Sequence, residues 1–319
     1  MGRITNVACV GAGLIGQGWA TQFAAGGLNV VLYDPDTDAL AEAPARIRSN
    51  LDFLESHGLA ASGVTAEALD RIRTTGVLAD AVEKADYVQE SAREDYAVKE
   101  ELFREMDALA PERTILASST SGLLMSRIQK STTRPERCVL AHPFLPVHLL
   151  PLVEVVGGRD TSAQALDETC ELMRRIGKSP VLLNKEVPGF IVNRLQAALL
   201  REAVDLVGEG VATAEEVDRA FLLSVGMRGA FMGPLLRAHF AGNGIERFFE
   251  IFTGSYQVRL QTTATWSAFP EQAAQTTIES VKAMSMVRTK SLEELKQWRD
   301  EMLVALLKLP GLSSQPAGG

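Results

Sequence analysis

A glycine-rich segment near the start of the chain constrains the fold more than any other feature. Gly11-x-Gly13-x-x-Gly16 directly follows the apolar run 7–10 and opens an apolar stretch of helical character. In a strand–turn–helix unit, the first glycine permits a tight turn, the second lets the backbone approach a diphosphate, and the third lets helix and strand pack closely. The helix that follows offers unpaired N–H groups to an anion. The segment therefore predicts a dinucleotide-binding unit.

An acidic residue at the end of the next apolar run predicts which dinucleotide binds. Asp34 follows Gly11 at about the 20-residue distance at which a carboxylate accepts hydrogen bonds from the adenosine ribose. Its charge would repel the 2′-phosphate of NADP, and Pro35 and Asp36 provide no arginine to receive one. FAD proteins share the glycine pattern, but the sequence contains no second flavin motif. NAD is therefore the predicted cofactor.

Short apolar runs alternate with helical stretches through the first half of the chain. The runs cover 7–10, 30–33, 87–89, 114–117, 138–141 and 152–156, with a further short strand expected at 180–184. Such alternation is typical of a largely parallel sheet with helices on both faces. We therefore predict an α/β fold of the Rossmann type, with a doubly wound, mainly parallel sheet.

The pattern changes after residue 185. A Val-Pro-Gly break at 187–189 precedes an apolar-periodic helix over 190–209, and later helices are expected at 214–223, 245–257, 271–286 and 292–307. No later segment has a clear strand pattern. The length of 319 residues is compatible with two domains. We expect an NAD-binding Rossmann domain at 1–185 and an all-α domain at 186–319.

Composition excludes several classes of partner. The chain has 32 Lys and Arg against 40 Asp and Glu, and a net charge of −8 argues against nucleic acid. No apolar stretch is long enough for a membrane span. The three cysteines lack metal-ligand spacing, so no metal is expected, and the N-terminal residues run into a strand pattern rather than a secretory signal. We expect a cytoplasmic protein with a small-molecule ligand.

A histidine and a glutamate are the first candidates for catalysis. His142 ends the apolar run 138–141, where an α/β sheet presents residues to its ligand. Glu154 lies inside the apolar run 152–156, and a carboxylate buried there needs a partner. An ionised Glu154 beside His142 would orient the imidazole and stabilise its protonated form, as a general base requires. The spacing is equally compatible with a structural hydrogen bond or with no contact.

Two further polar positions are weaker candidates. The Ser-Ser-Thr-Ser-Gly turn at 118–122 follows a strand, so one of its hydroxyls could bind a substrate oxygen or cap the turn. Asn193 lies among apolar residues at the start of the helix expected at 190–209. Its side chain either points toward a substrate or satisfies local backbone groups.

Taken together, these motifs resemble the L-3-hydroxyacyl-CoA dehydrogenase superfamily. The residues that carry the resemblance are Gly11–Gly16, the turn 118–122, His142-Pro143 with Glu154, and the Pro-Gly-Phe-Ile-Val-Asn-Arg-Leu segment at 188–195. Within the superfamily, the chain looks most similar to the L-gulonate 3-dehydrogenase branch, which includes lambda-crystallin. That similarity extends over nearly the whole chain, through Gln89-Glu90, Lys99, Gly226-Met227-Arg228, 233–235 and 297–301.

The resemblance implies a role for each matching residue. It implies His142 as the catalytic base and Glu154 as its carboxylate partner. Ser121 matches the serine that hydrogen-bonds the reacting oxygen, and Asn193 matches the asparagine that orients the substrate. The family's NAD contacts correspond to the three glycines and to Leu14, Ile15, Asp34, Glu94 and Lys99. Arg228 matches an arginine implicated in substrate handling, and its guanidinium could bind a substrate carboxylate in bidentate fashion.

The resemblance implies NAD-dependent oxidation of the 3-hydroxyl group of a small L-3-hydroxy acid, with L-gulonate as the first candidate. L-carnitine and 3-hydroxyacyl-CoA remain alternatives, because Leu145 stands where the family usually has Asn and the segment 144–151 looks partly like L-carnitine 3-dehydrogenases. A non-catalytic, crystallin-like NAD-binding protein is the alternative of another class. The resemblance also implies that the helical domain binds substrate and forms a homodimer.

Overall fold

The computed structural model describes residues 4–309, and the chain divides into two compact units. Unit 1 comprises residues 1–193 and unit 2 residues 194–319. This division falls later than the boundary after residue 185 expected from the sequence, and it leaves Asn193 with unit 1. Within the described residues, no helix is long and apolar enough to cross a lipid bilayer.

Unit 1 is built on one eight-stranded sheet with the order β3-β2-β1-β4-β5-β6-β7-β8. Neighbouring strands are parallel except β6 and β7, which pair antiparallel. The strands are β1 Asn6–Val10, β2 Asn29–Tyr33, β3 Ile72–Thr75, β4 Tyr87–Glu90, β5 Ile115–Ser118, β6 Cys138–Pro143, β7 Leu152–Gly157 and β8 Ser179–Leu182. The predicted Rossmann-type, mainly parallel sheet is confirmed. The sequence missed β3 because this strand is short and mostly polar.

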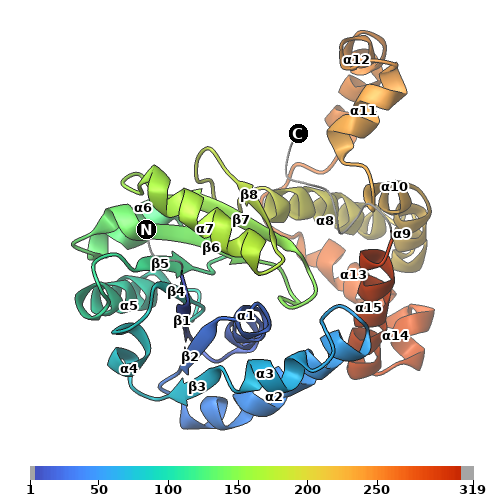
Figure 1. Ribbon diagram of the computed structural model, residues 1–319. Helices are drawn as coiled ribbons and strands as arrows, with labels where there is room; N and C mark the ends of the chain where they lie inside the picture. The colour runs from blue at the N-terminus through green and yellow to red at the C-terminus, as the bar shows by residue number, and fades with distance from the viewer. Residues whose placement is uncertain (1–3, 310–319) are drawn as a thin grey trace. The chain divides into compact units, whose positions relative to one another are not determined.

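Helices cover both faces of the sheet. They are α1 Leu14–Ala25, α2 Thr37–Ser56, α3 Val64–Leu69, α4 Leu78–Val82, α5 Tyr96–Leu109, α6 Met125–Ile128 and α7 Ala163–Arg175. Figure 1 shows α1 and α2 on one side of β4, and α4 and α5 on the other. One buried cluster joins the sheet to α1, α2 and α7, and a second joins it to α4, α5 and α6. The central strands β1, β4, β5, β6 and β7 are therefore buried on both faces, as their apolar sequences require, whereas the edge strands β3 and β8 are largely exposed.

The alternation of side chains along the strands assigns the candidate catalytic pair to one face. In β6, Val139 and Ala141 belong to the first cluster, whereas Cys138 and Leu140 belong to the second. Because successive side chains point to opposite faces, His142 lies on the face of the second cluster. The register pairs His142 with Glu154 across β6 and β7. Directly opposite residues of an antiparallel pair share a face, so the two side chains are neighbours.

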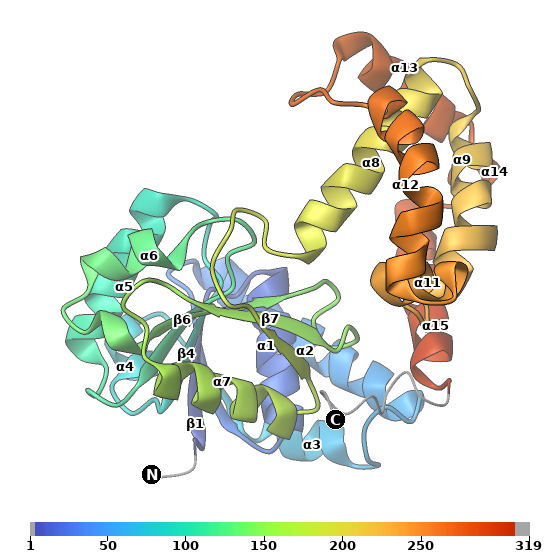
Figure 2. The same cartoon turned by 90° about the horizontal axis from the view of Figure 1, so that it is seen from above.

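In its described residues, 194–309, unit 2 consists of helices and the loops that connect them and contains no strand, which confirms the all-α prediction. After α8 Val192–Gly208 come α9 Ala214–Phe221, the π-helical turn η3 Leu222–Gly226, α10 Met227–Gly229, α11 Pro234–Gly242, α12 Ile245–Thr262, α13 Glu271–Ala283, α14 Ser285–Thr289 and α15 Leu292–Leu307. Figure 2 shows α12 as a long helix that follows α11. Helix α11 was not predicted from the sequence, and the helix expected at 271–286 is interrupted at Met284, where ψ is 137°.

Candidate active site

The glycine-rich turn between β1 and α1 leaves open space at its second glycine. Gly11 has a φ of +105°, and a Cβ on this residue would lie 2.8 Å from the carbonyl oxygen of Ser91. A Cβ on Gly16 would lie 1.8 Å from the carbonyl oxygen of Gly11. The protein itself therefore requires the first and third glycines. No atom lies within 4 Å of a Cβ placed on Gly13, which leaves the room that a diphosphate needs.

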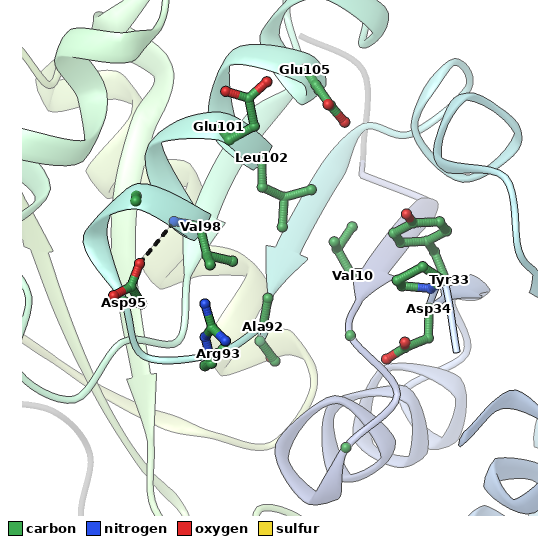
Figure 3. A pocket seen from close by; sticks show the side chains of 15 residues that line it. Val10, Tyr33, Asp34, Ala92, Arg93, Asp95, Val98, Glu101, Leu102 and Glu105 are labelled. Atoms are coloured by element: carbon green, nitrogen blue, oxygen red, sulfur yellow. Dashed lines mark hydrogen bonds between the residues drawn. The ribbon is translucent and has the colours of Figure 1, made fainter. Parts of the chain in front are cut away.

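Asp34 is held against this turn by backbone amides. Its Oδ2 accepts a hydrogen bond from the Ala12 amide at 2.7 Å, and its Oδ1 accepts one from the Asp36 amide at 3.0 Å. No side chain caps the N-terminus of α1, so the N–H groups beside Gly13 remain available to an anion. A cavity of about 760 Å³ opens here, with Asp34 on its wall (Figure 3). Open space, free N–H groups and a carboxylate together fit the diphosphate and ribose of NAD.

The other predicted NAD contacts lie at the start of α1 and after β4. Leu14 is 68% exposed, whereas Ile15 is half-buried. Lys99 is fully buried, and its Nζ donates to Glu90 Oε1 at 2.7 Å and lies 3.7 Å from Glu94 Oε2. Through these two contacts, the buried Lys99 fixes the position of the segment that follows β4. Glu94 is the more accessible of the two acidic partners.

The candidate base and its carboxylate form a buried hydrogen-bonded pair. His142 Nδ1 lies 2.9 Å from Glu154 Oε2, and the two residues are 5% and 1% exposed. Burial raises the pKa of Glu154, but hydrogen bonds from His142 and from the amides of Val192 and Ile191 outweigh it and hold that pKa below its ordinary value. Because an ionised carboxylate only accepts, Nδ1 carries a proton, and in the neutral imidazole the free lone pair is then on Nε2.

The second carboxylate oxygen of Glu154 meets the start of α8. Glu154 Oε1 accepts hydrogen bonds from the amides of Ile191 and Val192, both at 2.9 Å. The preceding residues Gly189 and Phe190 have φ angles of 77° and 47°, so α8 begins at Val192 and the predicted start at 190 is wrong. Phe190 is fully buried, with its ring centroid 5.6 Å from that of His142. This turn aims the helix N-terminus at Glu154, which stabilises its negative charge.

A second contact joins Ser121 and Asn193 at the same helix start. Asn193 Nδ2 donates to the carbonyl oxygen of Ser121 at 3.1 Å. Glu94 Oε1 in turn accepts from the Ser121 amide at 2.9 Å and from the Ser121 hydroxyl at 3.2 Å. Glu94 thus links the segment after β4 to the turn at 118–122. The start of α8 joins this pair to the His142–Glu154 pair.

A buried polar network, which was not predicted from the sequence, lies beneath these residues. Gln89 Nε2 donates to the Ser119 hydroxyl at 2.8 Å and to the carbonyl oxygen of Ala141 at 3.2 Å. Trp19 Nε1 also donates to the Ser119 hydroxyl, at 3.1 Å. The network ties α1, β4, β5 and β6 together just below the candidate site. A glutamine inside the apolar run 87–89 was the available signal, but the two side-chain and backbone groups to which it donates come from two distant segments.

The loop that follows His142 is held by a buried lysine. Lys178 is 5% exposed, and its Nζ donates to the carbonyl oxygens of Val147 and, at 2.8 Å, Leu150. Burial lowers the pKa of Lys178 to about 7. Leu145, which replaces the expected family asparagine, lies in this anchored loop with its side chain 51% exposed.

The remaining candidate, Arg228, belongs to unit 2. Its Nε donates to the carbonyl oxygen of Ser224 at 3.1 Å, and its side chain is exposed. It follows the π-helical turn η3, and such turns occur frequently at functional sites. The three cysteines are free and buried. Within residues 4–309, no group of His, Cys, Asp or Glu is arranged to hold a metal ion.

Known proteins are similar to this chain over both units. Residues 6–187 match the family model described as 3-hydroxyacyl-CoA dehydrogenase, NAD binding domain, and residues 189–275 match that of its C-terminal domain. An L-carnitine dehydrogenase of Pseudomonas sp. is 39% identical over 99% of this chain and 97% of its own length. An L-carnitine dehydrogenase of Nocardiopsis dassonvillei is also 39% identical, over 96% and 91%.

A solved structure is similar over nearly the whole chain. It is 5-formyl-3-hydroxy-2-methylpyridine 4-carboxylic acid 5-dehydrogenase, described as an NAD⁺-dependent dismutase. The TM-score is 0.82 at 31% sequence identity, and the match covers 95% of this chain and 97% of that one. The likeness therefore includes both the sheet of unit 1 and the helices of unit 2.

Proposed function

The chain belongs to the 3-hydroxyacyl-CoA dehydrogenase family, and from that premise we propose that it oxidises the 3-hydroxyl group of a small 3-hydroxy acid. It is an NAD-dependent dehydrogenase that acts on a CH–OH group, so the predicted cofactor and enzyme class are confirmed. The observation that carries the proposed chemistry is the buried His142–Glu154 pair, with its Nδ1–Oε2 distance of 2.9 Å.

We propose L-carnitine as the first candidate substrate. L-Gulonate is the substrate predicted first from the sequence, but the relatives that match over nearly the whole chain are named L-carnitine dehydrogenases. L-Gulonate becomes the second candidate, supported by the resemblance of the motifs. Both are small hydroxy acids with a free carboxylate, so one set of catalytic residues would serve either.

The geometry supports a separate chemical role for each candidate residue around the reacting carbon. NAD, when bound, supplies the acceptor for the hydride that leaves this carbon. His142 takes the hydroxyl proton at Nε2, and Glu154 stabilises the imidazolium that results. Ser121 and Asn193 hold the substrate oxygen, so that the proton and the hydride leave in a fixed geometry. Because Glu154 is anchored by two amides of α8, the imidazole keeps its orientation through the cycle.

We propose Arg228 as the residue that binds the substrate carboxylate. Its exposed guanidinium has donors left over after the single hydrogen bond to Ser224, and a carboxylate accepts two of them in parallel. An Arg228→Met variant should raise KM for a free hydroxy acid by about 10- to 100-fold, as expected for a lost charge-assisted pair. It should scarcely change KM for a CoA thioester, which has no free carboxylate at that end.

The test of this function is NADH formation from NAD and a panel of hydroxy compounds at alkaline pH. The panel contains L-carnitine, L-gulonate, 3-hydroxybutyrate and the CoA thioester of 3-hydroxybutyrate. A rate with L-carnitine supports the first candidate, and a rate with L-gulonate alone moves the protein to the second. A rate with the thioester alone contradicts the role of Arg228. If the chain binds NADH but gives no rate with any compound, the result favours the non-catalytic, crystallin-like alternative.

We also propose that unit 2 mediates a homodimer. Large apolar side chains on α12 are exposed, including Phe249 at 61% and Ile251 at 54%. Two others on the same helix, Phe248 and Phe252, are only half-buried and pack ring to ring with centroids 5.2 Å apart. Exposed apolar surface of this kind is typical of a protein interface. Light scattering should give twice the monomer mass, and a monomer mass at all concentrations contradicts the dimer.

A further inference from the structure

The cavity at the carboxyl ends of β1, β2 and β4 has a single positively charged side chain among its lining residues. Its lining contains one arginine, Arg93, and four acidic residues, which are Asp34, Asp95, Glu101 and Glu105. Figure 3 shows Arg93 on the wall that follows β4, and Asp34 on the facing wall. A cavity with this lining is strongly acidic overall, although the cofactor that enters it is itself an anion.

Three of the carboxylates already have partners, whereas Arg93 does not. Asp34 accepts from the Ala12 amide, Asp95 accepts from the Val98 amide at the start of α5, and Glu101 pairs with Arg104. Arg93 is exposed, and within residues 4–309 its side chain makes no hydrogen bond, ion pair or ring contact. Its guanidinium is therefore free to bind a ligand without breaking an existing interaction.

The free guanidinium matches the one strongly anionic part of NAD. The diphosphate enters beside Gly11 and Gly13, which line the same cavity as Arg93. Guanidinium and phosphate groups form short, bidentate, charge-assisted hydrogen bonds. We propose that Arg93 binds the diphosphate of NAD from the β4 side of the cavity and offsets the repulsion from the four carboxylates. This inference rests on the NAD dependence of the enzyme and is independent of the substrate.

A contact between Arg93 and the diphosphate predicts which fragments of NAD depend on Arg93 for their affinity. NADH and ADP both carry the diphosphate and depend on Arg93. Adenosine has the same base and ribose but no phosphate, so its affinity does not depend on Arg93. The α1 N-terminus is unaffected by substitution of Arg93, so binding of NADH is weakened rather than abolished.

The test is the affinity of the folded full chain for these three ligands, measured by NADH fluorescence and by competition, without substrate. Arg93→Ala should weaken binding of NADH and ADP by about 10-fold, and higher salt should narrow the difference. Arg93→Lys should recover part of the loss, because it keeps the charge but not the bidentate geometry. Arg159→Ala is the matched control: Arg159 is also exposed and has no ion pair with any described residue, but it does not line the cavity.

Three results would overturn the proposal. The first is an unchanged NADH affinity in Arg93→Ala. The second is an equal loss for adenosine, which would assign the contact to the adenine base. The third is an equal loss in Arg159→Ala, which would indicate a general effect of net charge. Because no substrate is present, these results stand apart from the outcome of the substrate panel.

Discussion

The two units differ in where they place their polar and apolar side chains. In the described part of the chain, every buried polar or charged side chain belongs to unit 1, including His142, Glu154 and Lys99. Unit 2 buries few apolar residues and exposes many large ones, such as Leu235 at 79% and Phe249 at 61%. Unit 1 therefore holds its buried polar groups in fixed geometry, whereas unit 2 leaves an apolar surface exposed, as the proposed dimer requires.

The largest effect that would sharpen this contrast is expected at Glu154. In a Glu154→Gln variant, the oxygen keeps the two amides of α8 while the NH₂ group faces His142 Nδ1. The imidazole then carries its proton on Nε2 and loses its function as a base. We expect kcat to fall by about 10²- to 10⁴-fold with little change in the midpoint of thermal unfolding.

The matched variant is Glu154→Ala, which removes the carboxylate and leaves buried donors unpaired. This change should cost about 1–3 kcal/mol of unfolding free energy for each unpaired group, in addition to the loss of rate. Both quantities follow from steady-state kinetics and urea unfolding. An active Glu154→Gln enzyme would show that the buried pair is only structural.

Two glycine→alanine substitutions, one in each unit, test whether an added methyl group affects NADH binding only in unit 1. A Cβ placed on Gly13 in unit 1 or on Gly254 in unit 2 would have no atom within 4 Å. Gly13→Ala should weaken NADH binding by about 10- to 100-fold, because the methyl group occupies space needed by the diphosphate. Gly254→Ala should leave NADH affinity unchanged and stabilise α12 by up to about 1 kcal/mol.

Fluorescence titration with NADH and thermal unfolding measure both variants. Equal NADH affinity in Gly13→Ala and in the parent chain would contradict the assignment of the cofactor to the glycine turn. A loss of NADH affinity in Gly254→Ala would contradict the separation of roles between the units.

The last prediction from this comparison concerns the stability of unit 1 rather than its activity, and it is the dependence of that stability on the protonation of Lys178. Its pKa is about 7 in the folded chain and 10.5 when unperturbed, so between these pH values the unfolded chain binds more protons. The free energy of unfolding therefore rises with pH across this window, and one pKa unit corresponds to about 1.4 kcal/mol. Below pH 7, the folded chain bears the full cost of burying a charged ammonium group, and this cost disappears as the pH rises. Lys178→Met should remove this rise in the free energy of unfolding.

Urea unfolding near pH 7 and at about pH 10 measures the effect as a difference between parent and variant. Comparing the two proteins cancels the titration of other groups. The exposed lysine variant Lys130→Met should show the same pH dependence as the parent chain. An equal pH dependence in Lys178→Met and the parent would contradict the lowered pKa.

The sheet and the glycine turn could be predicted because their signals are local. Gly11, Gly13 and Gly16 act within one strand–turn–helix unit, and the apolar runs of the strands are continuous in the sequence. The start of α8 could not be placed, since apolar periodicity continues through Phe190 while the backbone there has a positive φ. That turn is set by the tertiary contacts of Phe190 and Glu154.

Contacts between distant segments were less accessible to sequence reasoning. The pairing of His142 with Glu154 rests on an antiparallel register that the spacing permits but does not require. The link from Glu94 to Ser121, and the contact of Gln89 with Ser119, join the β4 segment to the turn that follows β5, and these two segments share no sequence pattern. The assigned roles of these site residues stay predictions that the experiments above test.

The most direct test of the central claim is NADH formation by a His142→Ala variant with L-carnitine, alongside its NADH affinity. The proposed mechanism predicts a loss of at least about 10³-fold in kcat with an NADH dissociation constant that stays within about two-fold of the parent value. A variant that binds NADH normally and still turns over L-carnitine at a rate near that of the parent would contradict the assignment of His142 as the base.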